Sequence, residues 1–202
     1  MHMSYDLWMS TDLAQIDPAK LRIELYPTEV LRMKARPVAV DCGIDASMRA
    51  LAERMVALMQ GAQGIGLAAP QVGLPIRLFV AHVPPDPEHE PDGSGLADSC
   101  DAPQVFFNPE IVEFSKDLEP YDEGCLSLPG ITGEVNRPST VTMRAIDIDG
   151  KEIEVRATGL LARCWQHEID HLDGVLILDK MTQMSRLKNR SRIKSMEKAA
   201  KR

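Results

Sequence analysis

The stretch that most constrains the fold is CWQHEIDHLDG, residues 164–174, because it contains two histidines four positions apart. On an α-helix, the rings of His167 and His171 lie on one face, one turn apart, where both can bind a single metal ion. Glu168 shares this face and can reach water at the metal as a general base without being a ligand. The pattern therefore predicts a metal-binding helix over residues 158–174. A charged helix face with two ordinary histidines is the alternative.

Two histidines do not complete a metal site, and the residues after them offer no strong third ligand. The position of the third histidine in metzincin peptidases is occupied by Ile177. No further histidine follows the helix, and the only later glutamate, Glu197, lies in a basic tail. Asp173 and Asp179 stay formally possible, but they lie at the helix end and beyond it. A ligand from before the two histidines is therefore expected.

Two cysteines remain as candidates for the third ligand. Cys164 shares the helix face, but it is seven residues from His171, about 10 Å along the axis, which is too far for a short side chain. We expect it to be a buried apolar wall beside the site. Cys125 lies in DEGCLSLPG, residues 122–130, where acidic neighbours raise the pKa of a free thiol and a divalent cation would instead deprotonate it. A buried, inert thiol is the alternative for Cys125.

The remaining patterns indicate one further helix and several strands. Residues 45–64 carry apolar side chains at helical spacing. Residues 76–83 and 105–115 are predicted strands, and residues 139–158 are a predicted hairpin with an Asp-Gly turn. Hairpins between two long helices indicate an α+β fold. We expect antiparallel or mixed sheets packed around a central metal-binding helix, with a second core helix and a C-terminal helix.

The chain of 202 residues suits one domain with terminal extensions. We expect a single catalytic domain at residues 21–184, preceded by an extension at residues 1–20. Residues 84–103 are rich in Pro, Gly, Asp and Glu and are predicted to form a flexible acidic insertion loop. Residues 175–181 are predicted to be extended, and residues 185–202 are predicted to form a basic helix.

Charge is distributed unevenly along the chain. Residues 180–202 contain nine Lys and Arg and one Glu, a net charge of +8, so the remainder of this chain of net charge −7 carries −15. An acidic body with a basic tail favours chemistry in the body and an electrostatic contact through the tail. The alternative is that a thin apolar stripe of Leu187, Ile193 and Met196 packs the tail helix on the body.

The sequence shows no signal for export and no membrane span. No stretch approaches the roughly 18 apolar residues of a spanning helix, and the N-terminal stretch lacks the Lys and Arg of a signal or transit peptide. The four cysteines are therefore expected to be free thiols in a reducing cytoplasm. They are Cys42, Cys100, Cys125 and Cys164. We expect no membrane partner and no specific DNA binding.

Three short motifs, in this order, resemble the signature motifs of the peptide deformylase family. They are GIGLAAPQ at residues 64–71, EGCLS at 123–127 and QHEIDH at 166–171. Each motif alone is moderately specific, and the ordered triple is very specific. The resemblance extends from about Leu21 to the C-terminal helix, which is similar to that of type-1 bacterial members.

The resemblance implies a hydrolase that removes the formyl group from N-formylmethionine of nascent polypeptides and releases formate. One divalent metal ion would be bound by three side chains, those of Cys125, His167 and His171. The family commonly works with Fe²⁺, and the thiolate ligand also allows Zn²⁺, Ni²⁺ or Co²⁺. Glu168 would be the catalytic carboxylate. Gln71 and the backbone N–H of Leu126 would stabilise the negatively charged oxygen of the transition state.

The resemblance also implies how a peptide is held. Three residues would offer backbone hydrogen bonds to it, as to an added strand; they are Ile65, Gly66 and Gly124. Leu160 and Cys164 recur on one helix face with the ring of His167, and we expect them to line an apolar slot for the methionine side chain.

Three further implications concern the surroundings of the site. Glu123 is expected to form an ion pair with Arg137. Position 132 carries an arginine in some members that shapes the substrate entrance; here it is Thr132, which puts the preference beyond methionine in doubt but not the chemistry. The basic helix at 185–202 implies docking near the ribosomal exit tunnel, where phosphate charge is dense.

Two functions from other classes stay open. A zinc endopeptidase of the HExxH type would take a third ligand from downstream and cleave internal peptide bonds. A metal-dependent ribosome-binding protein without activity would need none of the catalytic groups, and the presence of Glu168, Gln71 and the complete ligand set argues against it.

Overall fold

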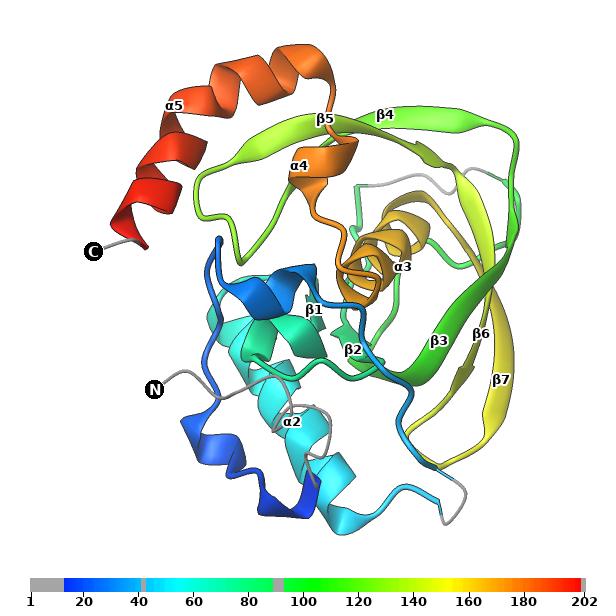
Figure 1. Ribbon diagram of the computed structural model, residues 1–202. Helices are drawn as coiled ribbons and strands as arrows, with labels where there is room; N and C mark the ends of the chain where they lie inside the picture. The colour runs from blue at the N-terminus through cyan, green and yellow to red at the C-terminus, as the bar shows by residue number, and fades with distance from the viewer. Residues whose placement is uncertain (1–12, 41–42, 89–92, 201–202) are drawn as a thin grey trace.

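Two antiparallel sheets surround the helix that carries the two histidines (Figure 1). The structure is a computed structural model that describes residues 13–40, 43–88 and 93–200. The larger sheet has the strand order β1-β2-β3-β6-β7. Its strands are β1 (Gly66–Ala68), β2 (Leu78–Ala81), β3 (Gln104–Phe114), β6 (Thr140–Ile146) and β7 (Glu152–Thr158). The smaller sheet is a hairpin of β4 (Leu118–Gly124) and β5 (Thr132–Pro138).

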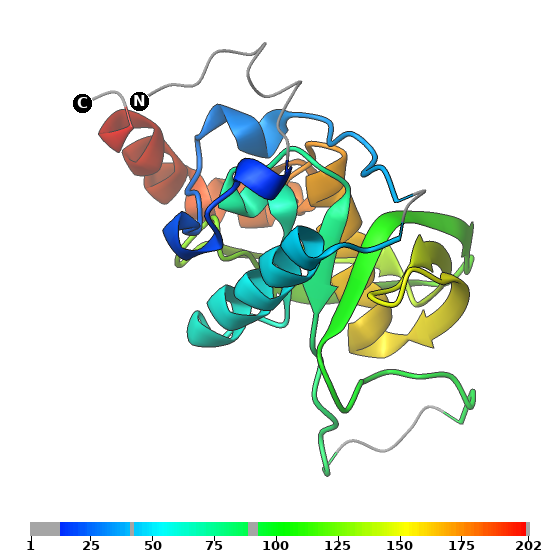
Figure 2. The ribbon, with the colours of Figure 1, turned by 90° about the horizontal axis from the view of Figure 1, so that it is seen from below.

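The helices lie in three places relative to these sheets. They are α2 (Ala46–Gly61), α3 (Gly159–Leu172), α4 (Ile177–Lys180) and α5 (Gln183–Ala199). Helix α3 passes through the middle of the molecule, α2 packs beside β1 and β2, and α5 lies on the outside along β5 (Figures 1 and 2). Short 3-10 helices complete the described chain; they are η1 (Leu13–Gln15), η2 (Pro18–Lys20), η3 (Glu29–Arg32) and η4 (Ala69–Val72).

Apolar packing fixes the position of α3. Trp165 is buried and meets the ring of Phe106 in β3 edge-on, with 5.5 Å between the ring centroids. Leu161 and Leu172 are buried in the same cluster. Each such side chain contributes about 1.5–3 kcal/mol on full burial, so the helix cannot shift without losing much of the core.

The α+β fold, with antiparallel sheets around a central helix, is confirmed. The predicted helix at 45–64 is α2, whose first turn is capped by the Asp45 carboxylate on the Met48 N–H at 2.8 Å. The hairpin of β6 and β7 is also confirmed, with Gly150 at φ +79° in its turn. The segments 84–88 and 93–96 contain no helix or strand and project from the body in Figure 2, whereas Ala97 bridges to Ala157 in β7 and Cys100 packs against the core.

Two expectations for the C-terminal part are wrong. Within residues 175–181, Ile177–Lys180 form the helix α4 and are not extended, because the Asp179 carboxylate caps it by accepting the Leu176 N–H at 2.9 Å and buried side chains hold the turn against the body. In α5, Ile193 and Met196 pack on the body as expected, whereas Leu187 is 61% exposed and faces away from it. The hairpin of β4 and β5 was not predicted.

Candidate metal centre

The structure brings three predicted ligands together from two distant parts of the chain. Ligand atoms of Cys125, His167 and His171 all lie within 4.8 Å of one another. The Cys125 Sγ is 3.2 Å from the His171 Nε2. The histidines come from α3, and the cysteine from the turn that joins β4 to β5. Cys164 lies outside this group: its thiol donates to the Ile65 carbonyl at 3.3 Å.

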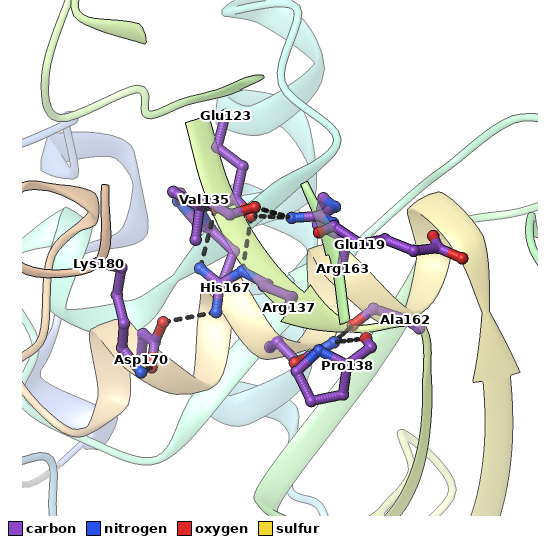
Figure 3. A network of polar contacts seen from close by, with 11 residues as sticks. Glu119, Glu123, Val135, Arg137, Pro138, Ala162, Arg163, His167, Asp170 and Lys180 are labelled. Atoms are coloured by element: carbon purple, nitrogen blue, oxygen red, sulfur yellow. Dashed lines mark hydrogen bonds and ion pairs between the residues drawn. The ribbon is translucent and has the colours of Figure 1, made fainter. Parts of the chain in front are cut away.

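A buried carboxylate orients the first histidine (Figure 3). The His167 Nδ1 is 3.0 Å from the Glu123 Oε2, which turns Nε2 of the same ring toward the cluster. Glu123 also accepts two hydrogen bonds from Arg137, at 2.6 and 2.9 Å. These contacts keep the pKa of Glu123 well below its usual range despite the desolvation that opposes ionisation. A carboxylate behind a metal-binding imidazole is the usual device that fixes the tautomer and orientation of the ring.

The ion pair of Glu123 and Arg137 belongs to a longer chain of charges. Arg137 also donates to Asp170 at 2.7 Å, and Asp170 meets Lys180 at 3.2 Å. The pair itself was expected; its extension through Asp170 to the start of the C-terminal region was not.

Glu168 lies beside the cluster in an environment that favours its neutral form. Its side chain is buried, and Oε2 has no hydrogen-bond partner within the described chain. Burial raises the pKa of Glu168 to about 7. Gly66 makes this approach of strand and carboxylate possible, because a Cβ there would lie 2.2 Å from the Glu168 Oε1. A buried oxygen without a donor, next to three metal-binding atoms, is what a proton acceptor for a water molecule requires.

The side chain of Gln71 is locked in one orientation. Its Oε1 accepts the Ala68 N–H at 2.9 Å, which fixes the amide against a flip. Its Nε2 donates to the Ser127 Oγ at 3.2 Å and lies 3.5 Å from the Cys125 Sγ. The amide N–H groups are thus held beside the cluster. Ser127 was not singled out in the sequence, and its place in the EGCLS motif was the available signal.

A pocket of about 480 Å³ opens on the cluster. Every predicted substrate-contacting residue lines it, together with the predicted catalytic residues; they are Ile65, Gly66, Gln71, Gly124, Leu126, Leu160, Cys164 and Glu168. Tyr121 and Arg163 line it too and were not predicted. One wall is β1 and α3, and the other is β4 with the turn that follows it.

Two findings bear on the remaining expectations. Cys100, Cys125 and Cys164 are free thiols, while Cys42 lies outside the described residues. Each helix within the described residues is too short or too polar to span a lipid bilayer.

Comparisons with known proteins agree with this geometry. A sequence profile of the family described as polypeptide deformylase matches residues 20–187. A peptide deformylase of Mesorhizobium japonicum is 42% identical over 88% of this chain and 91% of the relative. One of Methylocella silvestris is 45% identical over 89% of this chain and 84% of the relative. The crystal structure of peptide deformylase from Ehrlichia chaffeensis, 34% identical, has a TM-score of 0.77 and covers 89% of this chain and 96% of that one. The chain is an enzyme that belongs to the peptide deformylase family.

Proposed function

We propose that this enzyme hydrolyses the formamide bond of N-formylmethionine at the start of nascent polypeptides, releasing formate and a free amino terminus. The observation that carries the proposal is the convergence of the Cys125 thiol with His167 and His171 beside the buried Glu168. A thiolate in place of a third histidine or a downstream glutamate separates this site from that of a zinc endopeptidase.

The three donor atoms fit one divalent transition-metal ion. For bonds of about 2.0–2.3 Å at tetrahedral angles, two ligand atoms lie about 3.5 Å apart, close to the 3.2 Å between the Cys125 Sγ and the His171 Nε2. The thiolate and imidazole donors suit Fe²⁺, which we propose as the physiological ion, and also Zn²⁺, Ni²⁺ or Co²⁺. When bound, the ion supplies Lewis acidity that makes a water molecule reactive near neutral pH.

Glu168 is the proton carrier of the proposed reaction. Its unpaired Oε2 accepts the proton of the attacking water as the water oxygen bonds to the formyl carbon. The same carboxyl group then delivers this proton to the departing amine as the carbon–nitrogen bond breaks. A pKa of about 7 suits both transfers, since the group can accept and donate at neutral pH.

Gln71 and the backbone N–H of Leu126 stabilise the negative charge that develops on the formyl oxygen. Both residues line the pocket, and the hydrogen bonds of Gln71 to Ala68 and Ser127 hold its amide before substrate arrives. A preorganised donor of this kind contributes about 3 kcal/mol to stabilisation of the transition state.

The peptide binds between two sheet edges. Among the described strands, β1 pairs only with β2 and β4 only with β5, so each leaves one edge toward the pocket. The backbone groups of Ile65, Gly66 and Gly124 are proposed to pair with the peptide as with an added strand. Leu160, Cys164 and the ring of His167 line the slot for the methionine side chain.

The basic helix α5 is the proposed docking element for the ribosome, in keeping with a cytoplasmic enzyme. None of its residues is buried, and its cations face solvent or the rim of the body. Changing Lys188 and Lys194 together to glutamate should abolish salt-sensitive ribosome binding, whereas the same change at Lys116 and Lys151 on the body should preserve it. Equal retention by both double variants would refute docking through α5.

Formate release from formyl-Met-Ala-Ser, with and without a chelator, tests the proposed function. We expect release that stops on metal removal and returns on addition of Fe²⁺ or Co²⁺. The same peptide protected by an acetyl group in place of formyl is the matched control and should be turned over far more slowly. Cleavage of internal peptide bonds without formate release would favour the endopeptidase instead.

In this proposal, residues 21–184 form the catalytic domain. Residues 1–20 are an extension, 84–103 are an insertion, and residues 185–202, most of which lie in α5, are the docking segment.

A further inference from the structure

A buried arginine connects the metal-binding helix to the opposite wall of the pocket. Arg163 is 7% exposed and lies on α3 four residues before His167, and therefore on the same helix face. A guanidinium group is seldom buried unless it is fully paired, because removing it from water is costly. Its contacts therefore indicate what it is there to hold.

The guanidinium group of Arg163 binds both strands of the hairpin. Nη2 donates to the Glu119 carbonyl in β4 at 2.6 Å, and Nη1 donates to the Val135 carbonyl in β5 at 3.0 Å. The group also lies 5.3 Å from the ring centroid of Tyr121, which lines the pocket. One side chain thus fastens the small sheet, which is one wall of the pocket, to α3, which is the other (Figure 3).

The same group shares the carboxylate that orients His167. The Arg163 Nη1 donates to the Glu123 Oε1 at 2.8 Å, while the His167 Nδ1 contacts the Glu123 Oε2 at 3.0 Å. Arg137 contacts both oxygens, but it also pairs with Asp170. Among the ion pairs of the described chain, Arg163 pairs with Glu123 alone. Arg163 therefore holds the oxygen of the Glu123 carboxylate that His167 does not contact.

We propose that Arg163 is a positioning residue: through Glu123 it sets the orientation of the His167 ring, and through the hairpin it sets the distance between the two walls of the pocket. This inference rests on the proposed metal site at Cys125, His167 and His171. We therefore expect the planar guanidinium group of Arg163, with its several N–H donors, and not its charge alone, to determine how firmly the metal ion is retained.

The test measures the rate at which Co²⁺-loaded protein loses its ion to an excess of chelator, together with the Co²⁺ absorption spectrum. Because groups behind a metal ligand typically change metal affinity by about 10–100-fold, Arg163→Met should accelerate loss at least about tenfold and alter the spectrum. Arg163→Lys keeps the positive charge without the planar guanidinium group and should accelerate the loss of Co²⁺ at least about threefold. Should Arg163→Met fail to fold, the lysine variant decides.

Arg77→Met is the matched control. Arg77 is also largely buried and also binds one carboxylate, that of Asp173 at 2.8 Å, and one carbonyl, that of Pro109 at 2.9 Å, but it does not reach Glu123. It should lose stability like the Arg163 variants while keeping the wild-type Co²⁺ spectrum and rate of metal loss. If the Arg77 and Arg163 variants lose metal equally fast, Arg163 has only a structural role and the proposal is overturned.

A double-mutant cycle with Glu123→Gln tests the route of the effect. When two residues act through one contact, their effects on the rate of metal loss are not additive. Arg163→Lys should therefore add less than about twofold in the Glu123→Gln background. Full additivity would overturn the proposal. Failure of the wild-type protein to bind Co²⁺ would instead refute the proposed metal site, so the two failures are distinguishable.

Discussion

Helix α3 and the hairpin of β4 and β5 face each other across the metal centre, but different forces hold them. Helix α3 is packed between the sheets by Trp165, Leu161 and other buried apolar side chains. The hairpin has only two strands, and apart from buried residues such as Val135 its side toward the site is polar. It is tied to α3 by two ion pairs, one between Arg137 of β5 and Asp170 of α3 and one between Glu123 of β4 and Arg163 of α3. The wall formed by α3, called here the apolar wall, therefore determines the stability of the fold. The wall formed by the hairpin, called here the polar wall, determines the geometry of the ligands.

The largest effect is expected in the apolar wall. Trp165→Ala should lower the free energy of unfolding by about 3–5 kcal/mol, because it leaves a large cavity beside Phe106. Urea denaturation followed by circular dichroism measures the change. A loss of less than about 1 kcal/mol would show that apolar packing does not hold α3 and would break the distinction between the two walls.

The buried carboxylate on α3 should make the stability of the metal-free protein depend on pH. The pKa of Glu168 rises on folding from 4.5 to about 7. Its stabilising contribution to the free energy of unfolding is therefore fully present below pH 4.5 and is lost as the pH rises through about 7. Such a shift corresponds to about 3 kcal/mol. Unfolding of metal-free wild type and Glu168→Gln should therefore give similar stabilities at pH 4.5 and a more stable variant at pH 8. Parallel pH profiles for the two proteins would contradict this.

The hydrogen bonds that hold the Gln71 amide should affect the turnover rate and not the binding of substrate. Gln71→Ala should lower kcat about 100-fold, as loss of an oxyanion donor does. Ser127→Ala removes the hydroxyl that holds the Gln71 amide and should lower kcat about fivefold, the equivalent of one hydrogen bond. KM for formyl-Met-Ala-Ser should stay nearly unchanged in both variants. If Ser127→Ala lowers kcat equally in the Gln71→Ala background, the serine does not act through Gln71.

The smallest effect is expected where α5 supports the hairpin from outside. Asn189 donates to the Thr132 carbonyl at 2.7 Å, at an exposed position. Asn189→Ala should lower the free energy of unfolding by about 1 kcal/mol or less, without changing metal content or kcat. A faster loss of Co²⁺ in this variant would show that α5 also shapes the ligand geometry.

The two walls also differ in how far their sequence predicted them. The periodicity of the sequence predicts helix α3, and the spacing of His167 and His171 then places both imidazole rings on one face. The strands β4 and β5 lack an apolar alternation: Pro120, Gly133 and several acidic residues give their segments the composition of a loop. Their pairing is nonlocal and is stabilised by contacts with α3 that no local pattern contains.

Individual side chains, too, could be predicted only where a local pattern or motif indicates their role. Cys125 was singled out because Cys164 on α3 lies too far from His171 along the axis and because the motif around Cys125 resembles that of the family. Arg163 was missed because an arginine inside a helical pattern ordinarily indicates a solvent-facing position, and its burial depends on carbonyl groups of the unpredicted hairpin. The helical α4 was missed for a similar reason, since its Asp179 cap and buried contacts are tertiary features.

The central claim is that the metal ion joins the two walls, with two ligands from the helix and one from the hairpin. Metal content after loading with Co²⁺ and exhaustive dialysis tests it most directly, in Cys125→Ser and in Cys164→Ser. We expect Cys125→Ser to lose the ion and the thiolate-to-metal absorption, and Cys164→Ser to keep about one ion per chain and the wild-type spectrum. Retention of both by Cys125→Ser, or their loss in Cys164→Ser alone, would contradict it.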